Sequence, residues 1–130
     1  MKQVLQPPGW ATPKGYVNGV SARGAQVFVA GQIGWNAQCQ FESDDLVTQV
    51  RQALINVRAV LAEAGAMPEH IVRMTWYLVD KRDYLARVRE IGAAYREVIG
   101  TYTVAMTAVQ VAALIEDRAL VEIEVTAIVP

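Results

Sequence analysis

Two glutamates near the C-terminus are the side chains of this sequence with the most direct potential for chemistry. Glu122 and Glu124 alternate with Val121, Ile123 and Val125, so both carboxylates share one face of a predicted strand whose other face is apolar. A carboxylate pressed against apolar walls has a raised pKa, which suits general acid or base catalysis. The same alternation is also typical of an edge strand with one solvated face, and spacing alone favours that structural interpretation.

The single histidine and the single cysteine are weaker candidates. His70 follows Pro68 and Glu69 just before a predicted strand, a position more typical of an exposed or capping residue than of a catalytic one. Cys39 lies in the polar stretch 36–40, where no neighbouring group would lower the pKa of its thiol, so we expect a surface thiol and not a nucleophile. One histidine and one cysteine are too few for a zinc site within one subunit, and no metal is expected.

Composition excludes several classes of function. The 12 basic and 13 acidic residues give a net charge of −1 without a basic stripe, so nucleic acid is not an expected partner. Glycine-rich phosphate-binding loops and a nucleophile elbow are absent from the sequence. The first 14 residues contain three prolines and no long apolar run, which argues against a signal peptide. With one cysteine and no apolar run of membrane-spanning length, the sequence predicts a cytoplasmic protein without a membrane partner.

The hydrophobic content is high for a chain that we expect to form a single domain over residues 1–130. Hydrophobic residues make up 53% of the sequence and charged residues only 19%. A chain of this length buries only about two thirds of its unfolded surface when it folds alone, and large exposed apolar patches usually mark interfaces. We therefore expect an oligomer; the alternative is an ordinary, well-packed monomer.

The strands that would position these residues follow from composition and turn signals. Five segments are predicted as strands: 15–21, 25–33, 71–79, 105–113 and 120–129. The first two suggest a hairpin across a turn at Arg23-Gly24, after an irregular N-terminal arm that contains the three prolines. The second strand is almost continuously apolar, so both of its faces should be buried.

Two amphipathic helices are predicted between the strands. The first is capped by Ser43, has Asp44 and Asp45 in its first turn, and ends at Gly65. The second covers residues 83–98, with its tyrosines on the inner face. The order ββαβαββ fits an α+β fold in which both helices pack on one face of a single sheet. The other sheet face then needs a cover, for which an oligomer interface is the obvious candidate.

Five short segments connect the chain to a known family. They read GYVNGV at 15–20, FVAGQIG at 28–34, QVRQALIN at 49–56, AEAG at 62–65 and LVEIE at 120–124. Together they span nearly the whole chain and resemble the RidA/YjgF family, whose older label is endoribonuclease L-PSP. The resemblance implies a chorismate-mutase-like α+β subunit with a six-stranded type of mixed sheet. It also implies a homotrimer in which three sheets form a central barrel, with a ligand cleft at each subunit boundary.

The resemblance also implies an activity and a set of site residues. Well-known members of the family are deaminases that hydrolyse reactive imines and enamines to 2-oxo acids and ammonia, without a cofactor. By resemblance, Tyr16 lines the cleft and Glu122 positions the attacking water, while Gly31 and Ala108 lend their backbone to the cleft wall. The arginine with which the family holds the substrate carboxylate is replaced here by Met106.

Met106 changes what the cleft is expected to bind. Arginine binds a carboxylate with two parallel hydrogen bonds, whereas methionine has no donor. A buried carboxylate left without its partner costs several kcal/mol, on the order of a thousandfold in binding, so we do not expect the ordinary 2-iminobutanoate deaminase activity. Arg89 could supply the missing charge from another direction, although with Arg87 it fits a solvated helix face better. Alternatively, the substrate has no carboxylate at this point.

Two tryptophans are open to different interpretations. Trp35 either joins Tyr16 and Met106 in a cleft that suits a flatter or more apolar ligand, or packs at the rim of the barrel. Trp76 lies in a strand that alternates between apolar and polar residues, and we expect it in the core.

The leading hypothesis is a Rid-like homotrimer whose clefts bind a small metabolite. The clefts would hydrolyse an imine or enamine other than a simple 2-imino acid, with Glu122 as general base and Tyr16 orienting the substrate. The alternative is a non-catalytic trimeric module that binds a ligand or a partner protein. A ribonuclease is disfavoured by the charge balance and by the lack of a histidine pair.

Overall fold

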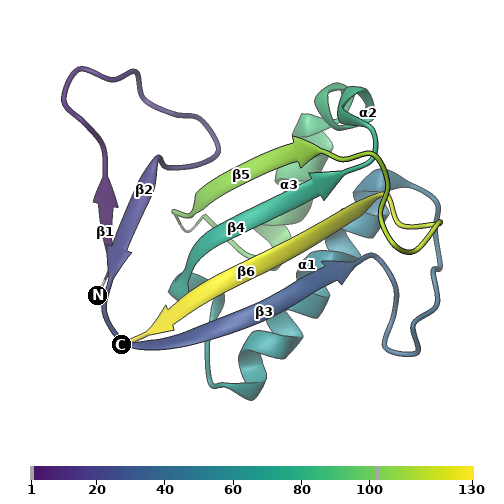
Figure 1. Ribbon diagram of the computed structural model, residues 1–130, viewed down its shortest axis with the longest axis horizontal. Coiled ribbons are helices and arrows are strands. Elements are labelled where there is room, and N and C mark those ends of the chain that lie inside the picture. Colours follow the sequence, from purple (N-terminus) through teal and green to yellow (C-terminus); the bar gives the residue numbers. More distant parts are fainter. Residues whose placement is uncertain (1, 102) are drawn as a thin grey trace.

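The strands of the chain form two sheets, shown in Figure 1, and the computed structural model describes residues 2–101 and 103–130. The small sheet contains β1 (Lys2–Leu5) and β2 (Gly19–Ala22). The large sheet consists of β3 (Ala25–Ile33), β6 (Val121–Val129), β4 (Ile71–Leu78) and β5 (Ala105–Gln110), in that order. Because β4 and β5 are parallel while the other neighbours are antiparallel, the large sheet is mixed, in agreement with the predicted α+β class.

The N-terminal region differs from the sequence prediction in two respects. Residues 2–5, expected in an irregular arm, form β1, and the three prolines lie in the loop that follows it. The predicted hairpin between 15–21 and 25–33 is wrong, because β2 pairs with β1 and β3 pairs with β6. The six strands therefore do not form one continuous sheet. A parallel bridge between Val17, two residues before β2, and Ala105 connects the segment that leads into the small sheet to the edge of β5.

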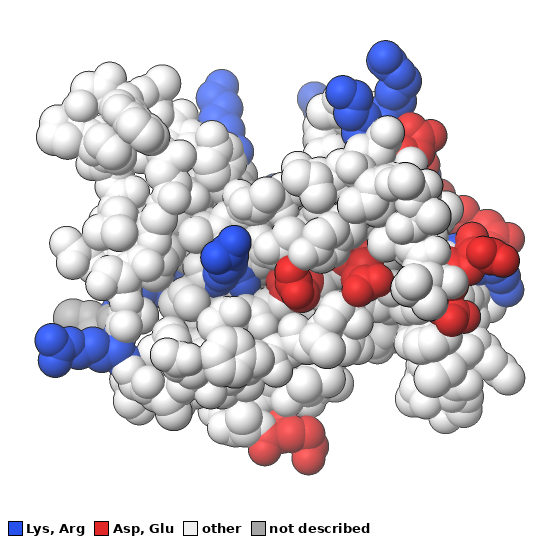
Figure 2. Space-filling model, viewed as in Figure 1, with Lys and Arg blue, Asp and Glu red and all other residues white. Residues whose placement is uncertain are grey.

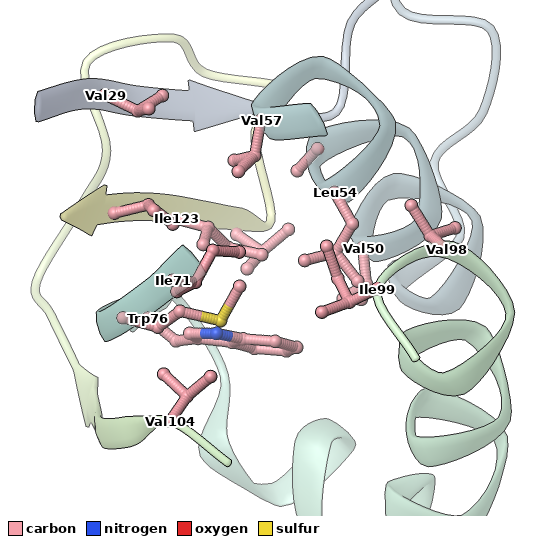
Figure 3. Packing of buried hydrophobic residues seen from close by; sticks show 14 of the residues in the cluster. Val29, Val50, Leu54, Val57, Ile71, Trp76, Val98, Ile99, Val104 and Ile123 are labelled. Carbon is pink, nitrogen blue, oxygen red and sulfur yellow. The ribbon is translucent and has the colours of Figure 1, made fainter. Parts of the chain in front are cut away.

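The two longer helices, α1 (Leu46–Glu63) and α3 (Val88–Val98), lie on one face of the large sheet (Figure 1), as their amphipathic patterns predict. Figure 3 shows side chains of α1 such as Leu54 facing strand residues such as Ile123. Trp76 belongs to this core and is 2% exposed, which confirms its predicted placement. No helix in the described part of the chain has the length and apolar character needed to cross a membrane.

The start of α1 corrects the predicted helix cap. Asp45 is the N-cap, and its carboxylate accepts a hydrogen bond from the Thr48 backbone N–H at 3.0 Å. The hydroxyl of Ser43 instead accepts from the Asp45 backbone N–H. Asp44 and Asp45 therefore precede the first turn and do not lie within it.

The second predicted helix is interrupted. It divides into α2 (Lys81–Ala86) and α3 at Arg87, whose backbone is not helical. The Arg87 guanidinium forms ion pairs with Asp45, before α1, and with Glu90, and these pairs hold the pKa of both carboxyl groups below their ordinary values. Arg87 thus links the start of α3 to the start of α1.

The face of the large sheet opposite the helices is uncovered within the chain. The alternation of β6 is confirmed, since Val121, Ile123 and Val125 are buried and Glu124 is exposed. The prediction that both faces of 25–33 are buried is wrong for the single chain, because Phe28 is 70% exposed. Figure 2 looks onto this face, which is largely uncharged with a few acidic and basic side chains near its centre. We call it the open sheet face.

Candidate functional site

A pocket of about 660 Å³ lies beside the edge strand β5, and we call it the β5 pocket. Its volume falls within the range of small-molecule sites in proteins. Its walls come from the loop before β2, the strands β4 and β5, the helices α2 and α3, and the segment that follows α3. The residues that line it are Lys14, Gly15, Tyr16, Val17, Trp76, Tyr84, Val88, Ile91, Gly92, Tyr95, Arg96, Gly100, Thr101, Thr103, Val104, Met106 and Ala108.

Strand register determines which side chains of β5 face the pocket. Met106 pairs with Met74 and Ala108 pairs with Trp76 in the parallel ladder of β4 and β5. Residues paired in register share a sheet face, so Met106 and Ala108 lie on the face that carries the core. Because β5 is an edge strand of the large sheet, these side chains lie at the margin of the core, where they border the pocket.

Aromatic rings form much of the inner wall. The rings of Trp76 and Tyr84 meet edge to face, with centroids 6.3 Å apart and an interplanar angle of 76°. Burial raises the pKa of Tyr84 and raises the pKa of Tyr95 to about 12, so both phenols are neutral at physiological pH. The Trp76 Nε1 is buried and has no acceptor among the described residues.

Glu122 and Gly31 lie together on the open sheet face, outside the β5 pocket. Glu122 pairs in register with Ile33 of β3 and with Tyr77 of β4. A Cβ atom at Gly31 would collide with the Glu122 carboxyl group, so a residue without a side chain is required beside this carboxylate. The neighbouring Glu124 accepts a hydrogen bond from the Tyr77 hydroxyl, which together with nearby charge raises the pKa of Tyr77.

The sequence-predicted residues therefore divide into two groups within one chain. Tyr16, Met106 and Ala108 line the β5 pocket, whereas Gly31 and Glu122 lie on the opposite sheet face. The strand β4 lies between β6 and β5, so two strand spacings, roughly 10 Å, separate the backbone of Glu122 from that of Met106 and Ala108. The first group offers a binding surface without a carboxylate, and the second offers a carboxylate without that surface.

Two further predicted binding residues, Arg89 and Trp35, also lie outside the pocket. Arg89 is exposed on α3 and does not line the β5 pocket; Val88 and Arg96 of the same helix do. Trp35 is half-buried after β3, with its ring centroid 5.8 Å from that of Phe41. This placement fits the packing interpretation of Trp35.

Tyr84, Tyr95 and Arg96 are among the residues of the pocket wall that sequence reasoning missed. A signal for the tyrosines was present, because the helical spacing of 83–98 places both on the inner face of the helix. That spacing does not distinguish a core residue from one that borders a pocket. Arg96 gives no such signal, because an exposed arginine in the last turn of a helix is common.

The histidine and the cysteine both lie in turns, outside the β5 pocket. His70 ends a short 3₁₀ turn, where its Nδ1 accepts a hydrogen bond from the Met67 backbone N–H at 2.9 Å. Cys39 is a free, exposed thiol with a φ of 60° in the turn after β3. Within residues 2–101 and 103–130, no three His, Cys, Asp or Glu side chains are grouped so as to hold a metal ion.

The chain is similar to proteins of one family over almost its full length. The profile of the endoribonuclease L-PSP family matches residues 9–129. A 2-iminobutanoate/2-iminopropanoate deaminase of Salmonella typhimurium is 34% identical over 113 residues, which cover 87% of this chain and 84% of that protein. The crystal structure of YyfB, a Rid-family protein from Yersinia pestis, has a TM-score of 0.84 and 32% identity, covering 98% of both chains. Escherichia coli TdcF with bound serine has a TM-score of 0.71 and 30% identity, covering 98% of this chain and 99% of that chain.

Proposed function

The chain belongs to the endoribonuclease L-PSP family, also known as RidA/YjgF, and from this premise we propose that it forms a homotrimer whose inter-subunit clefts bind a small metabolite. We further propose that these clefts hydrolyse an imine or enamine other than a simple 2-imino acid. The family includes proteins named as reactive intermediate deaminases. The observation that carries the proposal for this chain is the division of its candidate residues between two faces of one sheet.

An assembly between subunits would unite the two groups. The open sheet face carries Glu122 and the exposed ring of Phe28, and an exposed apolar surface of this kind is typical of an interface. In a closed cyclic trimer each subunit presents the same pair of surfaces to its neighbours, so one type of cleft would occur three times. Each cleft would combine the β5 pocket of one subunit with Glu122 and Gly31 of the next.

The proposed reaction needs only water and the side chains of such a cleft. Glu122 of the partner subunit takes a proton from water while the oxygen attacks the carbon of the C=N bond. The nitrogen receives that proton from Glu122, which gives a carbinolamine. Glu122 then takes the proton of the new hydroxyl group and passes it to the nitrogen, the C–N bond breaks, and a carbonyl and ammonia are formed. Tyr16, at the exposed edge of the pocket, would orient the substrate through its hydroxyl.

Met106 determines the kind of imine that we propose. The family resemblance predicts an arginine at this position, and the thioether of Met106 offers no donor for a substrate carboxylate. Its neighbours in the wall include Trp76 and Tyr84, which favour an apolar or planar group at this point. A short 2-imino acid, whose carboxylate is attached directly to the imine carbon, would leave that carboxylate without a partner.

Ammonia release from a panel of imines generated in situ tests the catalytic role of Glu122. We expect the Glu122→Gln variant to lose about a hundredfold or more of the wild-type rate above the uncatalysed reaction, because general-base catalysis contributes factors of this size. Glu124→Gln is the matched control: Glu124 lies on the same strand face and is bonded to Tyr77, and this variant should keep the wild-type rate. Equal rates for the wild type and Glu122→Gln on every imine would instead favour the alternative, a non-catalytic trimeric module that binds a ligand or a partner protein.

A further inference from the structure

The β5 pocket has a positive rim that the family resemblance does not predict. Lys14 and Arg96 line the pocket and are exposed, and no carboxylate lines it among the described residues. Within the same part of the chain Arg96 forms no ion pair, whereas Arg87, at the start of the same helix, is paired with both Asp45 and Glu90. The pocket therefore presents positive charge that no side chain described in the structure neutralises.

Gly92 explains how Arg96 reaches the pocket wall. Gly92 lies one helical turn before Arg96 on α3 and lines the same pocket. A Cβ atom at Gly92 would lie 3.3 Å from Arg96 Nη1, so the guanidinium group folds back over the glycine. A side chain at position 92 would crowd the guanidinium group in this position.

The rest of the wall is suited to a flat ring. Trp76, Tyr84 and Tyr95 come from three different elements and border one space, with Tyr16 at its edge. Aromatic rings attract other rings through stacked or edge-to-face contacts. The phenols of Tyr84 and Tyr95 are neutral at physiological pH, as tyrosine ordinarily is, and burial raises the pKa of both further. Within one chain, the wall therefore adds no negative charge that would repel an anion; in the proposed trimer, the cleft also receives Glu122 of the partner subunit.

We propose that the β5 pocket binds molecules that combine a planar aromatic body with one acidic group. The ring lies against Trp76, Tyr84 and Tyr95, and the acidic group contacts Arg96 at the rim. This inference rests on the proposed function, because it names the ligand class of the same cleft. It also explains how the cleft would hold an acidic substrate although Met106 offers no donor: the acid binds a cation of α3 and not one of β5.

Calorimetric titration of the intact protein with phenylacetate, phenylacetamide and 2-oxobutanoate tests the proposal. We expect phenylacetate to bind about tenfold or more tightly than its neutral amide, because the amide loses a charge-assisted hydrogen bond. We expect 2-oxobutanoate, which has no ring, to bind more weakly than phenylacetate. Arg96→Gln should weaken phenylacetate binding about tenfold or more and leave phenylacetamide binding unchanged. Arg82→Gln, an exposed arginine of α2 outside the pocket, should change neither.

Four outcomes would overturn the proposal. They are equal binding of phenylacetate and phenylacetamide, unchanged phenylacetate binding in Arg96→Gln, tighter binding of 2-oxobutanoate than of phenylacetate, and no binding of phenylacetate at millimolar concentration. The titration does not depend on turnover, so it separates the ligand class from the catalytic proposal. Arg96-dependent binding without imine hydrolysis would support the ligand class and remove only the catalytic role of the cleft.

Discussion

At the scale of single residues, Met106 shows how one side chain can redirect a site. The strand register places it beside Met74, on the core face of an edge strand, where it borders the β5 pocket. An arginine in its place would project a rigid fork of donors among the aromatic residues of the wall. The thioether leaves the interior of the pocket apolar and leaves the positive charge at its rim, on Lys14 and Arg96.

The Met106→Arg variant should therefore gain activity toward short 2-imino acids. We expect its rate of 2-iminobutanoate hydrolysis to rise about tenfold or more above that of the wild type, because a bidentate arginine supplies a partner for the carboxylate. Met106→Leu is the matched control, since it keeps an apolar side chain of similar volume and should show no gain. An equal gain in both variants, or a wild type that already matches Met106→Arg, would show that position 106 does not select the substrate.

The candidate site was accessible from the sequence only in part. Tyr16, Met106 and Ala108 were predicted from the family resemblance and line one pocket. Arg89 was a candidate and lies outside it, while Arg96 takes a place in the wall. The direction of a helical side chain depends on where the helix begins, and the break at Arg87 resets that start. The sequence alone does not reveal this break.

At the scale of elements, the hydrophobic patterns of the sequence predicted the type and the buried face of individual helices and strands. The amphipathic spacing of α1 and the alternation of β6 are both confirmed, because each reports a single element with one buried face. The pairing of β2 with β1, and of β3 with β6, was not predicted. Pairing depends on contacts between segments far apart in the chain, which turn signals do not encode.

Gln49 connects several elements of the fold through hydrogen bonds of its buried side chain. Its buried side chain donates to the Ser43 carbonyl and to the Arg118 carbonyl, both at 3.0 Å, and accepts from the Leu120 N–H at 2.8 Å. It thereby joins α1 to the loop before the helix and to the start of β6. A Cβ atom at Gly34 would collide with Gln49, so the chain after β3 also packs directly against it.

Replacing Gln49 by alanine should destabilise the protein substantially. We expect the free energy of unfolding to fall by about 2–4 kcal/mol, because three hydrogen bonds are lost and backbone groups become unsatisfied in a buried site. Chemical denaturation monitored by circular dichroism measures this change. Gln52→Ala, which removes one bond to Asn56 at a half-buried position of the same helix, should cost about 1 kcal/mol or less. Equal losses for the two variants would contradict the role given to Gln49.

At the scale of the whole molecule, the two faces of the large sheet have different roles. One face packs against α1 and α3 and forms the core, while the open sheet face carries Phe28, Tyr77 and the two glutamates of β6. The high hydrophobic content predicts that such a surface needs a cover, but composition does not identify what covers it. The separation of Glu122 from the β5 pocket is what favours a second copy of the chain as that cover.

The most direct test of an inter-subunit site is complementation between two inactive variants. Glu122→Gln removes the proposed base, and Ala108→Phe fills the β5 pocket, so each homotrimer alone should be inactive on the best imine substrate. Light scattering should give each a mass of about 43 kDa, three times the 14.3 kDa of one chain. When equal amounts are unfolded and refolded together, random cyclic trimers should recover about a quarter of the wild-type activity, because mixed trimers contain one cleft with both halves intact. A mixture of trimers that stays as inactive as its two components would contradict the account, because it would mean that each cleft takes its pocket and its glutamate from the same subunit.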